Sequence, residues 1–170
     1  MNNRERVYAI FHSQPYDRMP IVHFGFWRET LEKWHREGHI SREEWLGWAD
    51  GNEYDRSIGE KLGFDFNWGT CFCPNTGLFP PFEEKDVGPY PPGGRMVQNR
   101  DGVIVLRIGG GGMNKLVFSK TREAVEQEVQ RLKGLAALGG YIPCPDHRIA
   151  PDASWDNVKY YCEKMREAFS

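Results

Sequence analysis

The feature that most limits how this chain can fold is a stretch rich in glycine and proline near its middle. Residues 69–92 read GTCFCPNTGLFPPFEEKDVGPYPP, and four consecutive glycines follow at 109–112. Because these residue types interrupt both helices and strands, residues 69–92 are predicted to be mostly loop. The segments on either side carry regular patterns instead. At 170 residues the chain is expected to form one domain, with room for an appended piece.

Helix signals occur on both sides of this stretch. Asn2 is followed three residues later by Glu5, and Ser41 by Glu44, which is the spacing of a capping box. Apolar residues at helical spacing, followed by stop signals, predict further helices over residues 28–37, 53–62, 121–138 and 154–169. The third of these has two possible start residues, Thr121 and Ser119.

Short apolar or alternating runs predict the strands. Residues 20–26 (PIVHFGF) and 140–144 (GYIPC) are predicted to be short strands. Residues 64–68 (FDFNW) alternate, with three aromatic residues on one side and Asp65 and Asn67 on the other, which is typical of a strand with one buried face. The turn signal Asp101-Gly102 predicts a β-hairpin over residues 94–109.

Charge and hydropathy exclude some classes of partner. The net charge is −2 and the isoelectric point is about 6.2, so the composition makes no electrostatic case for binding nucleic acid or anionic lipid. The N-terminus lacks the apolar core of a signal peptide, and no apolar run approaches membrane-spanning length. We therefore expect a cytoplasmic protein whose four cysteines are free thiols or metal ligands.

Three segments from the two ends of the chain carry a family resemblance. They are RERVYAIFHSQPYDRMPIVHFGFW with RETLEKWHREG, then QNRDGVIVLRIGGGGM, and NKLVFSKTREAVEQEVQRLKGLAALGGYIPCPDHRIAPDASWDNVKYYCEKMRE. Together they resemble the uroporphyrinogen decarboxylase superfamily, which includes the corrinoid-dependent methyltransferases. The family fold is a (β/α)₈ barrel, which needs about 250 residues. The resemblance thus implies an internally truncated member, with its seam near Gly109–Asn114.

The fold class implied by this resemblance is α/β. It is a partial (β/α)₈ TIM barrel that retains the first and last barrel segments plus an accessory β-hairpin, divided into residues 1–113 and 114–170. In a closed barrel the first and last strands pair in parallel, so residues 20–26 and 140–144 are expected to lie side by side. Such a pair has two open edges, which predicts either a homo-oligomer formed through those edges or marginal stability.

The candidate site residues follow the predicted strands. By resemblance, His147 matches a histidine or cysteine after the last family strand that holds or protonates substrate or binds zinc. Asp146, which precedes it, is a candidate for substrate binding. The structural alternative for His147 is a loop histidine that is hydrogen-bonded to Asp146 or to the backbone. Arg28 and His23 flank the end of the first strand. The alternatives for these two are a solvent-exposed arginine at a helix start and a histidine of the core.

A metal site is a weaker expectation. Cys71 and Cys73, with Cys144 and His147, could supply four zinc ligands, although their spacing matches no standard zinc finger. Family members that bind zinc use a central His-x-Cys pair, and that segment is missing here. Zinc or a corrinoid is therefore implied as a cofactor by resemblance only.

The resemblance implies three alternative functions. The first is methyl transfer involving a corrinoid protein or a small methylated substrate, with little or no activity in so short a chain. The second is decarboxylation of a porphyrinogen in porphyrin biosynthesis. It is disfavoured because the family uses a pair of arginines after the first strand, where only Arg28 lies nearby. The third is a non-catalytic assembly module that pairs through open strand edges.

Overall fold

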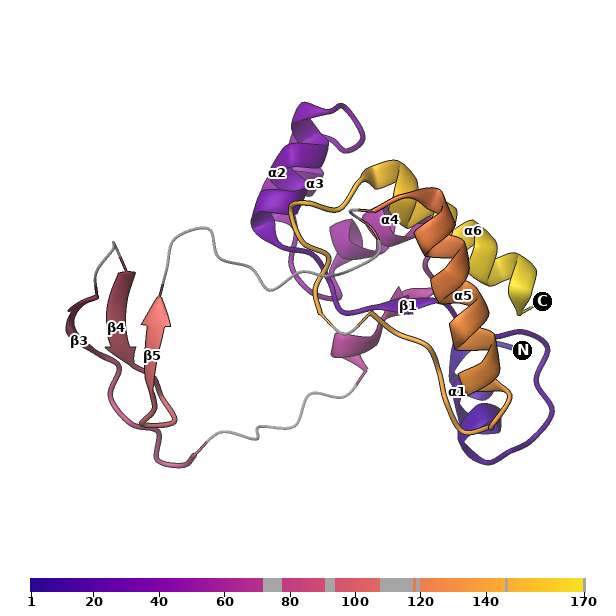
Figure 1. Ribbon diagram of the computed structural model, residues 1–170, viewed down its shortest axis with the longest axis horizontal. Helices are drawn as coiled ribbons and strands as arrows, with labels where there is room; N and C mark the ends of the chain where they lie inside the picture. Colours follow the sequence, from indigo (N-terminus) through magenta and orange to yellow (C-terminus); the bar gives the residue numbers. More distant parts are fainter. Residues whose placement is uncertain (72–77, 91–93, 108–117, 119, 146, 170) are drawn as a thin grey trace. The chain divides into compact units, whose positions relative to one another are not determined.

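The structure, a computed structural model, falls into two compact units. Unit 1 comprises Met1–Phe72 and Asn114–Ser170, and unit 2 comprises Cys73–Met113. The residues described are 1–71, 78–90, 94–107, 118, 120–145 and 147–169. Unit 1 therefore joins both ends of the sequence, and unit 2 comes from the stretch between them (Figure 1).

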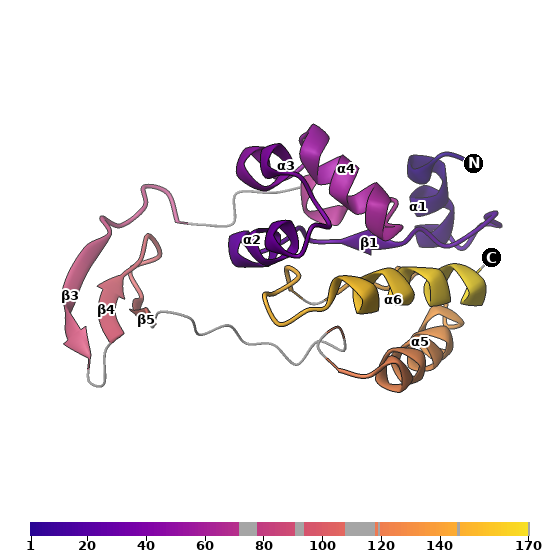
Figure 2. The ribbon, with the colours of Figure 1, turned by 90° about the horizontal axis from the view of Figure 1, so that it is seen from above.

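Unit 1 is mostly helical. Its elements in chain order are α1 (Asn3–Phe11), β1 (Val22–His23), α2 (Arg28–Arg36), α3 (Arg42–Gly47), α4 (Glu53–Leu62), β2 (Phe66–Asn67), the 3₁₀ helix η1 (Trp68–Thr70), α5 (Arg122–Ala136) and α6 (Trp155–Ala168). Helix α5 packs along α6, and α6 also contacts α4 (Figure 2). The late helices thus pack onto elements from the start of the chain.

The helix starts follow the capping signals of the sequence. Both predicted capping boxes are confirmed, because the side chains of Asn2 and Ser41 accept from the third helical N–H and the glutamate there accepts in return. Of the two possible starts for α5, Thr121 is the N-cap. Ser154 caps α6 as expected. Local hydrogen bonding alone therefore fixes where these helices begin.

The predicted partial barrel is wrong. β1 pairs in parallel with β2, Val22 opposite Phe66 and His23 opposite Asn67, and this two-stranded sheet does not close. Residues 140–144 form no strand, and the expected ladder between them and residues 20–26 is absent. One reason is that Pro143 and Pro145 lack the N–H that a ladder needs. Instead, an isolated parallel bridge pairs Phe26, shortly after β1, with Ile149.

Both sides of the alternating segment around β2 are at least half-buried. Asn67, on the polar side of FDFNW, is buried, whereas Phe66 and Trp68 are only half-buried. Phe64 is buried as the pattern suggests. The polar side of this strand therefore faces into unit 1, and Asn67 needs hydrogen-bond partners there.

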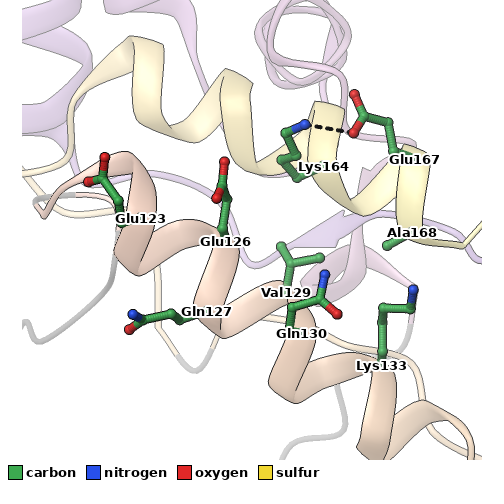
Figure 3. Close-up of a pocket in the computed structure, with 9 residues that line it drawn as sticks. All are labelled: Glu123, Glu126, Gln127, Val129, Gln130, Lys133, Lys164, Glu167 and Ala168. Atoms are coloured by element: carbon green, nitrogen blue, oxygen red, sulfur yellow. Dashed lines mark hydrogen bonds and ion pairs between the residues drawn. The ribbon is translucent and has the colours of Figure 1, made fainter.

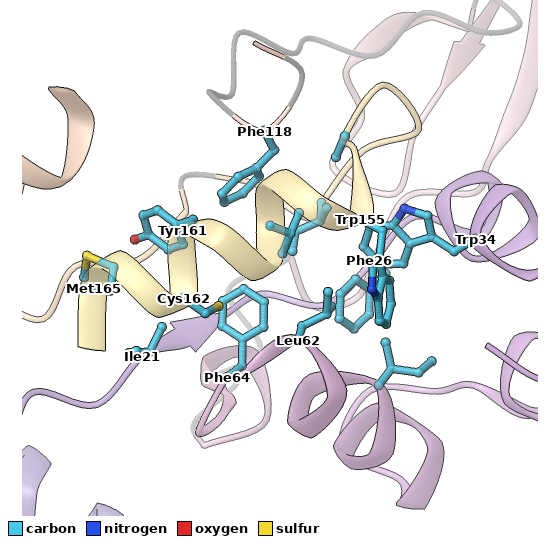
Figure 4. Packing of buried hydrophobic residues seen from close by; sticks show 14 of the residues in the cluster. Ile21, Phe26, Trp34, Leu62, Phe64, Phe118, Trp155, Tyr161, Cys162 and Met165 are labelled. Atoms are coloured by element: carbon cyan, nitrogen blue, oxygen red, sulfur yellow. The ribbon is translucent and has the colours of Figure 1, made fainter. Parts of the chain in front are cut away.

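The main core of unit 1 is built from both ends of the sequence. Helix α6 contributes Trp155, Val158, Tyr161, Cys162 and Met165, which share one helical face. This face meets side chains from earlier elements and the Phe118 ring, namely Ile21, Phe26, Trp34, Leu62, Phe64 and Phe118 (Figure 4). A smaller cluster holds Ile10, Met19, Val22 and Ile142. Residues 114–170 therefore complete a core that residues 1–72 begin.

Unit 2 is a three-stranded antiparallel sheet. Its strands are β3 (Lys85–Tyr90), β4 (Gly94–Gln98) and β5 (Ile104–Arg107), in the order β3-β4-β5. The predicted β4–β5 hairpin is confirmed, with Gly102 at a φ of +77° in the turn. β3 lies in the region predicted to be mostly loop, because its Gly88 and Pro89 obscure the strand pattern. Over the described residues, no helix is long and apolar enough to cross a membrane.

Candidate functional site

Polar side chains gather where β1 and β2 end. His23 and Asn67 are the last residues of the two strands and lie opposite each other in the parallel register. The bridge between Phe26 and Ile149 brings the neighbouring Arg148 to the same place. The loop before α4 adds Asp50. The carboxyl ends of parallel strands therefore meet a segment from near the end of the chain.

Asp55 is the buried centre of this group. It lies in the first turn of α4, which Asn52 caps, and its side chain is 2% exposed. Its carboxylate accepts hydrogen bonds from Trp48 Nε1 at 2.8 Å, Gly51 N at 2.9 Å and Asn67 Nδ2 at 3.0 Å. These donors compensate the loss of water around the carboxylate.

Asn67 links this buried carboxylate to a more exposed one. Its Nδ2 also donates to Asp50 Oδ1 at 3.0 Å, while its Oδ1 accepts from Gly69 N at 2.9 Å. The backbone carbonyl of Asn67 accepts from the Thr70 hydroxyl at 2.8 Å. With both ends of the amide bonded, the orientation of Asn67 is fixed, and the positions of the two carboxylates are coupled.

An ion pair between Arg148 and Asp50 forms the exposed end of the network. Both guanidinium Nη atoms donate to Asp50, Nη1 at 3.1 Å, and the guanidinium carbon lies 5.5 Å from the centre of the Trp48 ring. The two side chains are 42% and 37% exposed. Gly25, with a φ of +93°, lies directly beneath, where a Cβ would be 2.6 Å from Asp50 Oδ1. Only glycine fits this approach.

His23 lies under the network and is neutral at pH 7. Its Nδ1 accepts from Gly25 N at 2.9 Å, so the ring proton is on Nε2. Its ring packs between Phe26 and Phe64, 4.9 and 4.7 Å away between centres. Burial lowers the pKa of His23 to about 4, against the opposing effect of the Asp55 and Asp50 carboxylates. This histidine is 1% exposed, so it supports the site from within the core.

The other predicted site residues lie on the surface or outside the described chain. His147 is exposed, beside Arg148. Arg28 is exposed as the first residue of α2. Asp146 lies outside the described residues. His23 lies next to the network: its Nδ1 accepts from Gly25 N, and a Cβ on Gly25 would meet Asp50 and Arg148.

The proposed zinc ligands are not brought together in the part of the chain that the structure describes. Cys71 is exposed and its thiol donates to the Asn67 carbonyl over 3.8 Å. Cys144 packs beside the smaller apolar cluster, and burial raises the pKa of its thiol to about 12, which disfavours the thiolate that zinc binds. Cys73 lies outside the described residues. Across those residues, no three side chains of metal-ligand type cluster.

A separate groove of about 740 Å³ runs between α5 and α6. Its lining carries charges of both signs, and its Lys164 donates to Glu167 at 2.7 Å. The lining residues are Glu123, Glu126, Gln127, Val129, Gln130, Lys133, Lys164, Glu167 and Ala168 (Figure 3). It contains no residue singled out in the sequence, and its composition is that of a solvated helix surface.

The sequence pointed only indirectly to the residues that form the network. Asn67 carried a signal, since its place on the polar side of an alternating strand required a partner if that side was buried. Asp50, Asp55 and Arg148 carried none, because their meeting depends on contacts between residues up to 98 positions apart. Comparison of the chain with family models, curated proteins and solved structures gives no match.

Proposed function

We propose that this chain is an internally shortened member of the uroporphyrinogen decarboxylase superfamily, of the methyltransferase-like branch. Its ligand binds at the carboxyl ends of β1 and β2. The observation that carries the proposal is the hydrogen-bonded network of Asp50, Asn67 and Arg148, in which residues near both ends of the chain meet. Of these three residues, Arg148 lies in a segment that carries the resemblance, whereas Asp50 and Asn67 lie between such segments. We place the protein in the cytoplasm, where Cys71, Cys144 and Cys162 would stay reduced.

The charges of the site favour methyl transfer over decarboxylation of a porphyrinogen. A porphyrinogen carries many carboxylates, each of which is best bound by a guanidinium or ammonium group. The network has one arginine, Arg148, against two aspartates, so it offers a guanidinium to at most one of these carboxylates. A corrinoid or small methylated substrate makes no such demand for cations.

We expect binding with little or no turnover. Catalysis needs reacting groups held within fractions of an ångström, whereas His147 and Arg28 are both solvent-exposed. The network, in contrast, is anchored by the buried hydrogen bonds that Asp55 accepts from Trp48 and Asn67. The shortened chain thus retains a better basis for holding a ligand than for converting it.

Binding and turnover can be measured separately with methylcobalamin. We expect saturable quenching of tryptophan fluorescence, weakened at least about tenfold in Asn67→Ala because the network loses its bridge. Demethylation of methylcobalamin by a thiol should stay near the background rate. Asn157→Ala, which removes side-chain bonds to Phe118 and Lys120 carbonyls far along the chain, is the control. Absence of binding would refute the proposal, and decarboxylation of uroporphyrinogen would favour the alternative.

The second candidate function is an assembly module. It is favoured by one observation: among the described residues, the parallel sheet of unit 1 has two strands, so its edges could accept a further strand. Pairing with another copy or with a longer relative would extend it. Light scattering after size exclusion at micromolar concentration tests this, and a strictly monomeric, well-folded species would exclude self-pairing.

A further inference from the structure

The Arg148 guanidinium has hydrogen-bonding capacity beyond its ion pair. It carries five N–H groups, of which one on each Nη atom is used by Asp50. No further hydrogen bond of this guanidinium to the described residues is found, and its side chain is 42% exposed. Donors therefore remain on a charged, planar group that is reachable from solvent.

The surroundings hold this guanidinium in one orientation. Trp48 lies against it, and the indole is itself fixed by the 2.8 Å bond from Nε1 to the buried Asp55. Asp50 is fixed from the other side by Asn67. A guanidinium held in this way loses less conformational freedom on binding than one on a mobile side chain.

We propose that Arg148 binds a small oxyanion, a carboxylate or phosphate group, through the N–H groups that Asp50 leaves unused. Asp50 acts as the positioning residue and also weakens the site, because its negative charge opposes the incoming one. The affinity is therefore modest, and the anion is one part of a larger ligand. The inference rests on the proposed function only in placing this oxyanion within the ligand of that function.

The Trp48 indole N–H provides a direct readout. We would record ¹H–¹⁵N spectra during titration with sodium phosphate and, separately, sodium acetate, against sodium chloride at matched ionic strength. The Trp48 resonance is assigned by its loss in Trp48→Phe. We expect it to shift saturably with one or both oxyanions and not with chloride. The two titrations show whether phosphate or carboxylate is preferred.

The inference predicts opposite changes in oxyanion affinity for substitutions of Arg148 and Asp50. Arg148→Gln should weaken oxyanion binding at least about tenfold, since charge-assisted bonds are lost. Asp50→Asn should strengthen it several-fold, because the competing charge is removed while the amide can still accept from Asn67. Arg131→Gln, which removes an exposed arginine paired with Glu128, should leave binding unchanged.

Each result of these titrations supports or overturns the proposed oxyanion site. An equal shift with chloride, or unchanged binding in Arg148→Gln, overturns the inference. If Arg148→Gln fails to fold, weaker or unchanged binding in Asp50→Asn overturns it instead. No turnover or methylcobalamin is involved, so oxyanion binding can be found even if the proposed function fails. Methylcobalamin binding without an oxyanion site would refute this inference alone.

Discussion

The protonation of His23 couples the stability of unit 1 to pH. Burial lowers its pKa from 6.5 to about 4, so the unfolded chain binds a proton at pH 5 that the folded chain does not. The stabilisation is present above pH 6.5 and is lost as the pH falls towards 4. Between pH 7 and 5 this one group should cost about 2 kcal/mol of unfolding free energy.

His23→Asn isolates this contribution. The asparagine can place an acceptor near the Gly25 N–H but cannot titrate. Urea unfolding at pH 7 and pH 5 should therefore show a smaller loss of unfolding free energy in the variant than in the original chain. Equal losses in the two proteins would mean that His23 is not buried in its neutral form.

For single residues, the sequence indicated burial better than it indicated hydrogen-bond or ion-pair partners. The core alternative for His23 matches its 1% exposure. Asn67 was placed on the polar side of its strand, but the direction of that side depends on what packs against it. Arg148 was not singled out at all, because a loop arginine acquires a role only through Asp50, a residue remote in sequence.

At the scale of elements, Asp55 on α4 joins the segment before that helix to the end of β2. Its carboxylate binds the indole before α4, the loop at Gly51 and the end of β2 through Asn67. Asp55→Ala should lower the unfolding free energy by about 3 kcal/mol or more, since several buried donors lose their acceptor together. Asp156→Ala is the matched control in the first turn of α6, where the side chain is exposed and the expected cost is below about 1 kcal/mol. Similar costs in urea unfolding would contradict a central role for Asp55.

Element starts were predictable where a few neighbouring residues decide them, as at Asn2, Ser41 and Ser154. The strands were less predictable from the sequence. Residues 140–144 have an apolar pattern but no strand, because proline removes backbone donors and no neighbouring strand supplies a ladder. β3 has poor local propensity and forms through pairing with β4. Pairing is a property of two segments, and a single-segment pattern cannot show it.

At the scale of the whole molecule, unit 1 should fold without unit 2. Both apolar clusters draw all of their residues from unit 1, from before residue 73 and after residue 113. Replacing residues 73–113 with a flexible glycine-serine linker of about 20 residues should preserve cooperative unfolding, since a linker of this kind adds only modest closure entropy. We expect the urea midpoint to change little, with the tryptophan emission of the buried Trp34 and Trp155 retained.

The control for this deletion is a substitution in the shared core. Val158→Ala removes two methyl groups from a fully buried position on α6, where it should cost about 1–3 kcal/mol in the full chain and in the shortened one alike. If the shortened chain instead unfolds without cooperativity, residues 73–113 must supply interactions that unit 1 needs. If it unfolds normally and Val158→Ala has the same effect in both, then the two ends of the sequence form the folding unit by themselves.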